Sequence, residues 1–192
     1  MALVAVTLST VMPVFRWARK ELDTILRDGD RNHGTILSSL GRTADTIKRV
    51  GIYELTGQIV PVELRSGTFL MKGCPDHEAA GLLSVNPDVQ PRWDLGFVSL
   101  AEGLRMALDE TSGAVLTVGE YSMAVMRDPM GGVRLFDSHS RDPLGMFHPD
   151  GHAVLIKTRT LSDMEALFRR KLKQRGKKRA QFEVLGFKLM DQ

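Results

Sequence analysis

The run GAVLTVGEYSMAVMRDPMGGVRLFDSH, residues 113–139, decides the fold. It is rich in β-branched and large apolar residues and is interrupted by a Gly131-Gly132 turn, a pattern typical of successive strands. Two further strand-like segments follow it, HAVLIKTR at 152–159 and QFEVLGFKLM at 181–190. Because several strands follow one another along the chain, the pattern predicts an α+β domain with a central, largely antiparallel sheet.

Apolar spacing and capping residues predict four helices beside these strands. They are a helix over 16–30 that ends near Gly29, a short one around 36–40 that ends at Gly41, one after the N-cap Ser99 and one after the N-cap Ser162. From Ile52 to Lys72 the pattern is strand-like, with one strand in GQIVPVEL (57–64) and one in GTFLMKG (67–73) around a Ser66-Gly67 turn.

Length and composition bound the class of protein. The 192 residues suit one domain, and 43% apolar with 26% charged residues is typical of a globular chain. No apolar stretch approaches the roughly 20 residues of a membrane-spanning helix, and the first residues lack the positive start and cleavage site of a signal peptide. The single cysteine, Cys74, excludes an internal disulfide. We therefore expect an intracellular protein without a membrane anchor.

The net charge of +3 depends on one segment. RRKLKQRGKKR, residues 169–179, holds eight Lys or Arg, no acidic residue and no aromatic residue. Nucleic-acid-binding surfaces usually spread basic residues over a face with aromatics among them. The run is therefore interpreted as a solvated helix end and loop, and nucleic-acid binding is not expected.

Asp137 and His139 are the first candidates for chemistry. Residues two apart on a strand point to the same side, so the two side chains can meet while Ser138 points away. A carboxylate that accepts the imidazole N–H sets its tautomer and orients it as a general base. The same spacing is also typical of an exposed surface pair, and Arg141 with Asp142 is expected to form an exposed ion pair.

A base of this kind needs a nucleophile, and the only thiol is Cys74. The following Pro75 argues against a reactive position at a helix N-terminus. A metal site at His148 and His152 is disfavoured, because Pro149, Asp150 and Gly151 predict a turn between them. No phosphate-binding or dinucleotide-binding glycine motif is present, so no cofactor and no metal is expected.

The first residues, MALVAVTLSTVM, are apolar on nearly every side, which predicts a helix buried in the core. Such a helix normally follows a capping Ser, Thr, Asp or Asn and an entry segment. Here neither is present. We therefore expect the front end of the domain to be missing from residues 1–192.

The string SGAVLTVGEYSMAVMRDPMGGVRLFDSHSRDPLGMFHPDGHAVLIKTRTLSDMEALF, residues 112–168, resembles the ubiquitin-specific protease domain at the front of herpesvirus large tegument proteins and of related virus-like and mobile-element copies. KELDTILRDGDRNHGTIL, residues 20–37, is similar to the segment that follows the nucleophile helix of that family. The resemblance implies a single domain over 1–192 with a papain-like cysteine protease fold, a buried N-terminal helix and ubiquitin or its conjugates as partner.

The resemblance also implies roles for residues. His139 matches the general base of a Cys–His–Asp triad and Asp137 the residue that orients it. The family's cysteine opens the buried helix, with an amide side chain upstream, and both would precede Met1. The chain is thus predicted to be a deubiquitinase-like domain without its nucleophile and inactive as written. The alternatives are a pseudoenzyme that binds ubiquitin and a basic accessory domain for nucleic acid.

Overall fold

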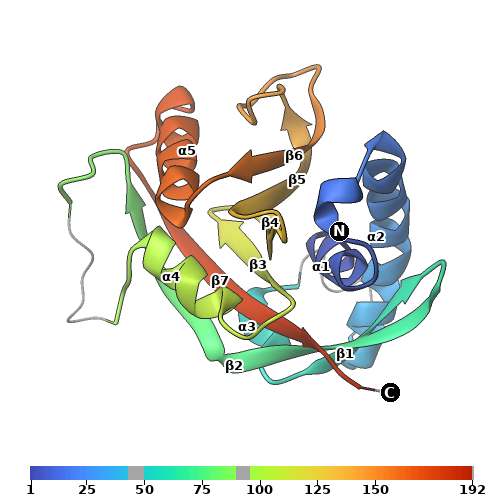
Figure 1. The fold of residues 1–192 in the computed structure, drawn as a ribbon. Helices are drawn as coiled ribbons and strands as arrows, with labels where there is room; N and C mark the ends of the chain where they lie inside the picture. The colour runs from blue at the N-terminus through green and yellow to red at the C-terminus, as the bar shows by residue number, and fades with distance from the viewer. Residues whose placement is uncertain (43–49, 90–95, 192) are drawn as a thin grey trace.

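The structure is a computed structural model that describes residues 1–42, 50–89 and 96–191. A curved sheet of seven strands lies at its centre, and helices cover both faces of the sheet (Figure 1). The helices are α1 (Ala2–Val11), the 3-10 turn η1 (Val14–Arg16), α2 (Arg19–Ser39), α3 (Ile52–Leu55), α4 (Leu100–Leu108) and α5 (Leu161–Gln174). The strands are β1 (Ile59–Leu64), β2 (Gly67–Ser84), β3 (Gly113–Val118), β4 (Tyr121–Arg127), β5 (Val133–Arg141), β6 (His152–Thr158) and β7 (Arg179–Leu189).

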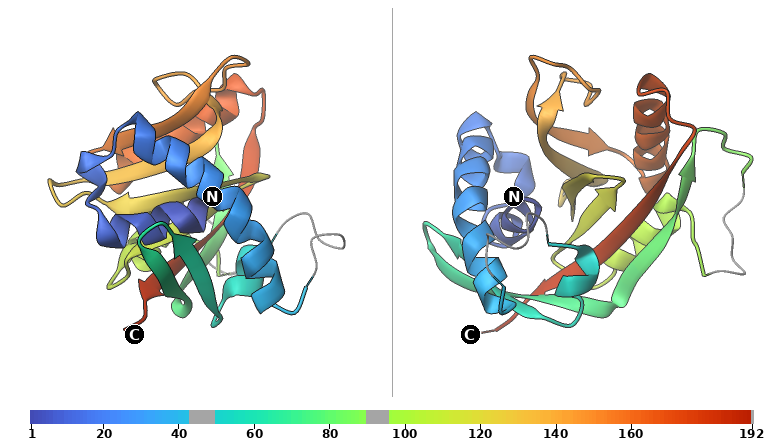
Figure 2. Two further views of the ribbon diagram at one scale, coloured as in Figure 1. Left: turned by 90° about the vertical axis from the view of Figure 1, so that its right-hand side faces the viewer. Right: turned by 180° about the vertical axis from the view of Figure 1, so that it is seen from behind.

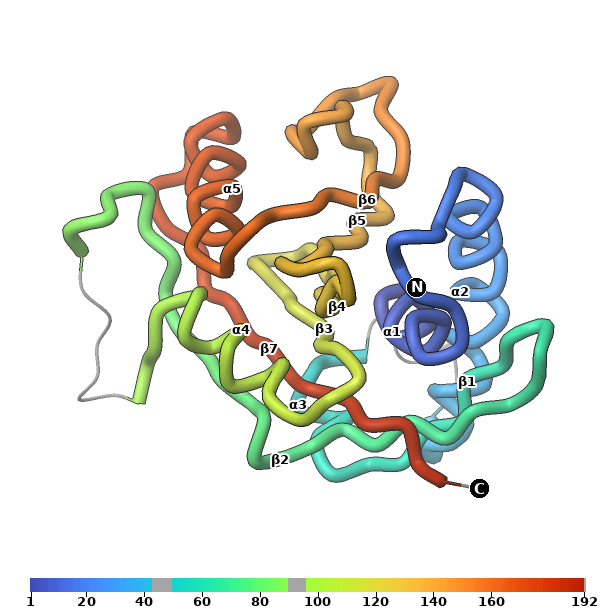
Figure 3. The backbone as a smooth tube through the Cα atoms, viewed as in Figure 1, coloured from blue at the N-terminus to red at the C-terminus, as the bar shows by residue number. Residues whose placement is uncertain are grey.

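The strand order is β1-β2-β7-β3-β4-β5-β6, and every neighbouring pair in it is antiparallel. The last strand of the chain, β7, lies in the middle of the sheet between β2 and β3 (Figure 3). It therefore joins the β1–β2 hairpin to the consecutive strands β3 to β6. The α+β class with a central antiparallel sheet, predicted from the order of the strands, is confirmed.

Residues along the central strands alternate between two apolar cores. On β3, Val115 packs with α1 and α2, whereas Leu116 packs with α4 and α5. On β5, Phe136 belongs to the core of α1 and α2, and Leu135 belongs to the core of α4 and α5. Figure 2 shows α1 and α2 on one face of the sheet and α4 and α5 on the other. Because both faces are covered, these strands appear in the sequence as continuous apolar runs.

The sheet curves around α1, which contacts β1 at one end of the sheet and β5 near the other (Figure 1). Residues Leu3 to Thr7 are buried on every side of the helix. The hydroxyl of Thr7, which has no exposed surface, donates to the carbonyl of Leu3 at 2.9 Å and so needs no water. The predicted buried N-terminal helix is confirmed.

The prediction of two helices between residues 16 and 41 is wrong, because α2 is one helix over Arg19–Ser39. Gly29 does not end the helix. A Cβ at this position would overlap Met1, so the glycine allows α1 and α2 to approach closely. The helix does end at Gly41, which has a φ of +69°, and the N–H of Arg42 donates back to the carbonyl of Leu37 at 2.9 Å.

The two predicted N-caps have different outcomes. Ser99 caps α4 as expected, and its hydroxyl accepts the N–H of Glu102 at 3.2 Å. Helix α5 begins two residues earlier than predicted, because Thr160 is its cap in place of Ser162. The side chain of each of Thr160 and Asp163 accepts the backbone N–H of the other at 3.0 Å. Asp163 therefore has the place in the capping box that was predicted for Glu165.

The region from Ile52 to Ser84 combines the predicted hairpin with two deviations. The strands β1 and β2 pair around the Ser66-Gly67 turn as predicted. Residues 52–55 form a helical turn in place of strand, because Glu54 accepts the N–H of Gly51 at 2.7 Å. Strand β2 continues through Pro75, which is tolerated because pairing with β7 shifts register between Gly73 and Glu78.

Within residues 1–42, 50–89 and 96–191, no helix combines the length and the apolar character needed to cross a bilayer.

Asn32 links α2 to the edge strand β1. Its amide nitrogen donates to the carbonyl of Glu63 at 2.8 Å, and its amide oxygen accepts the N–H of Glu63 at 2.6 Å. Asn32→Ala would leave both backbone groups of a part-buried residue unpaired, so we expect the free energy of unfolding to fall by about 2–3 kcal/mol. Urea denaturation measures this. Ser38→Ala, an exposed change on the same helix, is the control, and an equal effect of the two variants would contradict the prediction.

Candidate active site

The end of β5 departs from regular strand geometry. Its pairing with β6 runs as far as Asp137 opposite Val154 and resumes only at Arg141 opposite His152. Three residues of β5 thus lie opposite one residue of β6, which is a bulge. Bulges redirect side chains, and this one occurs where the sequence places its candidate residues.

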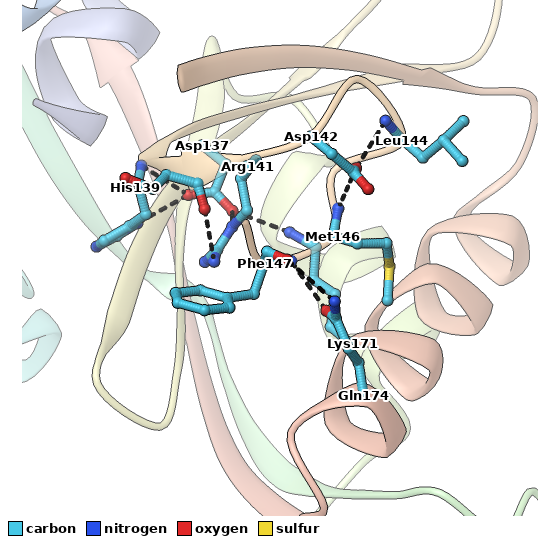
Figure 4. A network of polar contacts seen from close by, with 10 residues as sticks. Asp137, His139, Arg141, Asp142, Leu144, Met146, Phe147, Lys171 and Gln174 are labelled. Atoms are coloured by element: carbon cyan, nitrogen blue, oxygen red, sulfur yellow. Dashed lines mark hydrogen bonds and ion pairs between the residues drawn. The ribbon is translucent and has the colours of Figure 1, made fainter. Parts of the chain in front are cut away.

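Asp137 is the centre of the site. Its carboxylate has no exposed surface and accepts four N–H donors (Figure 4). Oδ1 lies 2.7 Å from Nδ1 of the His139 ring and accepts the backbone N–H of His139 at 3.1 Å. Oδ2 accepts Nε of Arg141 at 2.7 Å and Nζ of Lys171 at 2.9 Å. The predicted meeting of the Asp137 and His139 side chains is therefore present.

The charge state of Asp137 follows from these neighbours. Burial by itself raises the pKa of a carboxyl group, but the hydrogen bond from His139 and the charges of Lys171 and Arg141 outweigh it and hold the pKa of Asp137 far below its usual range. An ionised carboxylate only accepts hydrogen bonds. In the neutral form of the His139 ring the proton is therefore on Nδ1, and Nε2 carries the lone pair.

The prediction of an exposed pair between Arg141 and Asp142 is wrong. Arg141 is buried and pairs with Asp137. Asp142 instead accepts the N–H groups of Leu144 and Met146 at 2.9 and 2.8 Å, and so shapes the loop after β5. Alternation along the strand contained the signal for Arg141, because it stands two residues after His139 on the same side.

Lys171 is a residue of the site that the sequence does not reveal, because it lies in the basic run at 169–179, for which the composition predicts a solvated helix end and loop. That interpretation is wrong for two of its residues. Lys171 is buried and contacts Asp137, and Arg169 donates to the carbonyls of Ser84 and Asn86. These contacts fix α5 against the strands, which leaves fewer basic residues for an external ligand.

Tyr121 of β4 is the aromatic neighbour of the site. Its ring packs edge-on against the His139 ring, with 4.6 Å between the centroids. The guanidinium groups of Arg141 and Arg175 lie over the Tyr121 ring at 5.3 and 4.6 Å. The side chain of His139 keeps about a third of its surface exposed (34%), so it is held in place on one side and open on the other.

Ser138 points away from this network, as predicted. It lines an open pocket of about 510 Å³ between β5 and α2, together with Ser140 and with Asp23 of α2. Alternating residues of β5 thus face the two sides of the sheet, and the Asp137 network lies on the side of α5.

Cys74 lies far from His139 in the sheet. Strands β7, β3 and β4 separate β2 from β5, which amounts to four steps of about 4.8 Å along the sheet. Cys74 is buried, and its thiol donates to the carbonyl of Lys72 at 3.5 Å. Its position does not bring it together with the predicted base.

The N-terminal end of α1 lies across a pocket from the β3–β4 hairpin. Met1 and Ala2 line one pocket with Glu120 and Ser122 of that hairpin. Tyr121, between these two residues, packs on His139. The start of the buried helix therefore lies beside the hairpin whose Tyr121 packs on His139.

The residues between His148 and His152 form a turn, as predicted. The N–H of Gly151 donates to the carbonyl of His148 at 3.1 Å, and β6 begins at His152. Among the residues that the structure describes, no group of three or more His, Cys, Asp or Glu side chains could hold a metal ion.

Fold and site together define a class: a papain-like α+β fold, with a helix buried in a curved antiparallel sheet and, at the end of one strand, a buried aspartate bonded to a partly exposed histidine. The chain belongs to the family described as herpesvirus tegument protein, N-terminal conserved region, whose model matches residues 1–189.

Among solved structures, the chain is similar to the ubiquitin-specific protease encoded by murine cytomegalovirus tegument protein M48, determined in complex with a ubiquitin-based suicide substrate. The TM-score is 0.67 at 15% identity, over 100% of this chain and 77% of that chain, and the match confirms the predicted fold. No curated protein matches the chain.

Acid is expected to destabilise the fold through its buried carboxylates. The backbone N–H of Met130, together with Arg134 and Lys157, outweighs the effect of burial and lowers the pKa of Asp128 to about 2, and that of Asp137 is also depressed. In the unfolded chain both titrate near about 4. Their contribution to stability is present above that pH and is lost as the pH falls through the folded-state values.

We therefore expect the free energy of unfolding to fall steeply between about pH 4 and pH 2. Urea denaturation across this range measures it. Asp128→Asn should reduce the slope, because it removes one of the two depressed groups while keeping the acceptor for the N–H of Met130. Stability that does not change between pH 5 and pH 2.5 would contradict this assignment.

Proposed function

We propose that this chain is a cysteine-type deubiquitinase-like domain in which His139 is the general base and Asp137 orients it. The observation that carries the proposal is the 2.7 Å contact between Nδ1 of His139 and the buried carboxylate of Asp137. It occurs in a chain whose fold matches a protease solved with a ubiquitin-based suicide substrate. Ubiquitin and its conjugates are the proposed partners.

Each side chain has a defined task in such a reaction. Nε2 of His139 accepts the proton of a cysteine thiol, and Asp137 stabilises the imidazolium that forms. The thiolate attacks the carbonyl carbon that joins ubiquitin to its conjugate, and the imidazolium returns the proton to the leaving amine. Water then attacks the thioester with His139 as base, which releases ubiquitin and restores the thiol.

We infer that the thiol belongs to a residue ahead of Met1. Cys74 is a poor candidate, because it is buried and three strands separate it from the strand of His139. The end of α1 that carries Met1 supports the inference, since it shares a pocket with the hairpin that packs on His139. Residues 1–192 alone are then inactive, because the imidazole has no thiol to deprotonate. A free thiolate also suits the reducing interior of a cell.

The codons upstream of Met1 test this inference. We expect an in-frame Cys codon within a few residues, preceded by a Gln or Asn codon, and a stop codon there would contradict it. A chain extended to include that cysteine should form a covalent adduct with a ubiquitin-based suicide substrate, whereas residues 1–192 should not.

Cys74→Ala and His139→Ala are the matched variants for the extended chain. The first should leave the adduct unchanged and the second should reduce its rate by at least about a hundredfold. Labelling of residues 1–192 that disappears in Cys74→Ala would overturn the account.

A second candidate is a ubiquitin-binding pseudoenzyme. Residues 1–192 favour it, because they hold the fold and the Asp137–His139 pair but only a buried, distant thiol. Titration of labelled ubiquitin into this chain should give a saturable signal in the micromolar range, since removing a nucleophile does not remove a substrate groove. The signal should persist in Cys74→Ala. No saturable change up to high micromolar ubiquitin would exclude this function.

A further inference from the structure

We propose that Lys171 is a positioning residue for the base: it holds the Asp137 carboxylate in place from α5, and its positive charge opposes protonation of the His139 imidazole. The inference rests on the proposed role of His139 and adds to it a residue from a distant part of the chain. Lys171 stands 34 positions after Asp137 and belongs to a different element.

The two oxygens of Asp137 have separate partners. Oδ1 takes the ring and backbone donors of His139, whereas Oδ2 takes Arg141 and Lys171. A carboxylate bonded at one oxygen only could turn about its terminal torsion. Arg141 is on the same strand as Asp137, so Lys171 is the partner that ties the carboxylate to the helix layer on this face.

Burial of Lys171 points to a role for its charge. Lysine is rarely buried unless it is paired, because taking an ammonium group out of water is costly. The side chain of Lys171 is 11% exposed, and its ammonium group lies over the Phe168 ring at 5.1 Å. A methionine would fill this space without that cost, so packing alone does not explain a lysine here.

The charge count of the network explains what the lysine does. An ionised aspartate alone would favour the imidazolium form of His139, because opposite charges attract. Arg141 and Lys171 bring the network to a net charge of +1 while His139 is neutral, and protonation of His139 would raise it to +2. The two cations therefore oppose protonation, while Asp137 still orients the ring. A general base works best when it is neutral near the operating pH.

Two further charged groups lie near the Asp137–His139 pair. Arg175 reaches the site across the Tyr121 ring, and Asp142 acts on Lys171 from the loop after β5. Among the hydrogen bonds and ion pairs of the described residues, neither Arg175 nor Asp142 contacts the Asp137 carboxylate. The charged and titratable groups packed on His139 and Asp137 are Tyr121, Arg141, Lys171 and, one contact further out, Arg175 and Asp142.

The test is the titration of the His139 imidazole by NMR in residues 1–192, with the signal assigned by its loss in His139→Gln. In Lys171→Met we expect the midpoint to rise by about one pH unit, a tenfold gain in proton affinity, because one cation is removed. The fraction of the Nδ1–H tautomer should fall, since Asp137 is less firmly held. Lys171→Gln keeps an N–H donor but no charge and should raise the midpoint by a similar amount.

Two variants serve as controls. Lys173→Met removes an exposed charge from the same helix and should leave the midpoint unchanged, and Lys171→Arg keeps the charge and should stay near wild type. An unchanged midpoint in a folded Lys171→Met or Lys171→Gln overturns the proposal. So does failure of both neutral variants to fold while Lys171→Arg folds, because the charge would then be needed for folding alone.

The measurement requires neither a thiol nor ubiquitin, so the two ideas can fail separately. The chain could show a shifted His139 midpoint in Lys171→Met and yet neither bind ubiquitin nor form an adduct when extended. That result would exclude the proposed function but support the effect of Lys171 on His139. An unchanged midpoint in a chain that does react would remove only the role of Lys171.

Discussion

The Asp137 carboxylate is fully buried, and its four donors come from two elements that are separated by a loop and a strand. A buried charge persists only when its partners satisfy it, so β5 and α5 must keep their relative position for the site to exist. The requirement is mutual, because removal of the carboxylate would leave Arg141 and Lys171 as uncompensated buried cations. Local geometry at the end of β5 thus depends on how a whole helix packs.

Packing of α5 has both apolar and polar parts. Met164, Leu167 and Phe168 join the core on the convex face of the sheet. Arg169 binds backbone carbonyls at the end of β2, and Lys171 binds Asp137 on β5. These two basic residues bind strands that are separated by β7, β3 and β4. Their contacts explain why a helix with so much positive charge packs against the sheet.

Much of this fold could be predicted from the sequence, because the strands from Gly113 to Thr158 pair with neighbours along the chain and leave a local pattern. The Asp137–His139 contact was predictable for the same reason, since it needs only the alternation of a strand. Lys171 was not, because no local pattern links it to Asp137. Gly29 was misread as a helix end, because a glycine that permits close contact with another helix has the same appearance in sequence as one that ends a helix.

The curvature of the sheet connects the fold to the chemistry. Because the sheet wraps around α1, the end of that helix at Met1 and the β3–β4 hairpin share one pocket. The hairpin in turn carries Tyr121 against His139, whose side chain keeps about a third of its surface exposed. An imidazole whose Nδ1 donates to a buried carboxylate can accept a proton only at Nε2. The contact between β5 and α5 that buries Asp137 therefore also decides which nitrogen of the His139 ring is left to accept a proton.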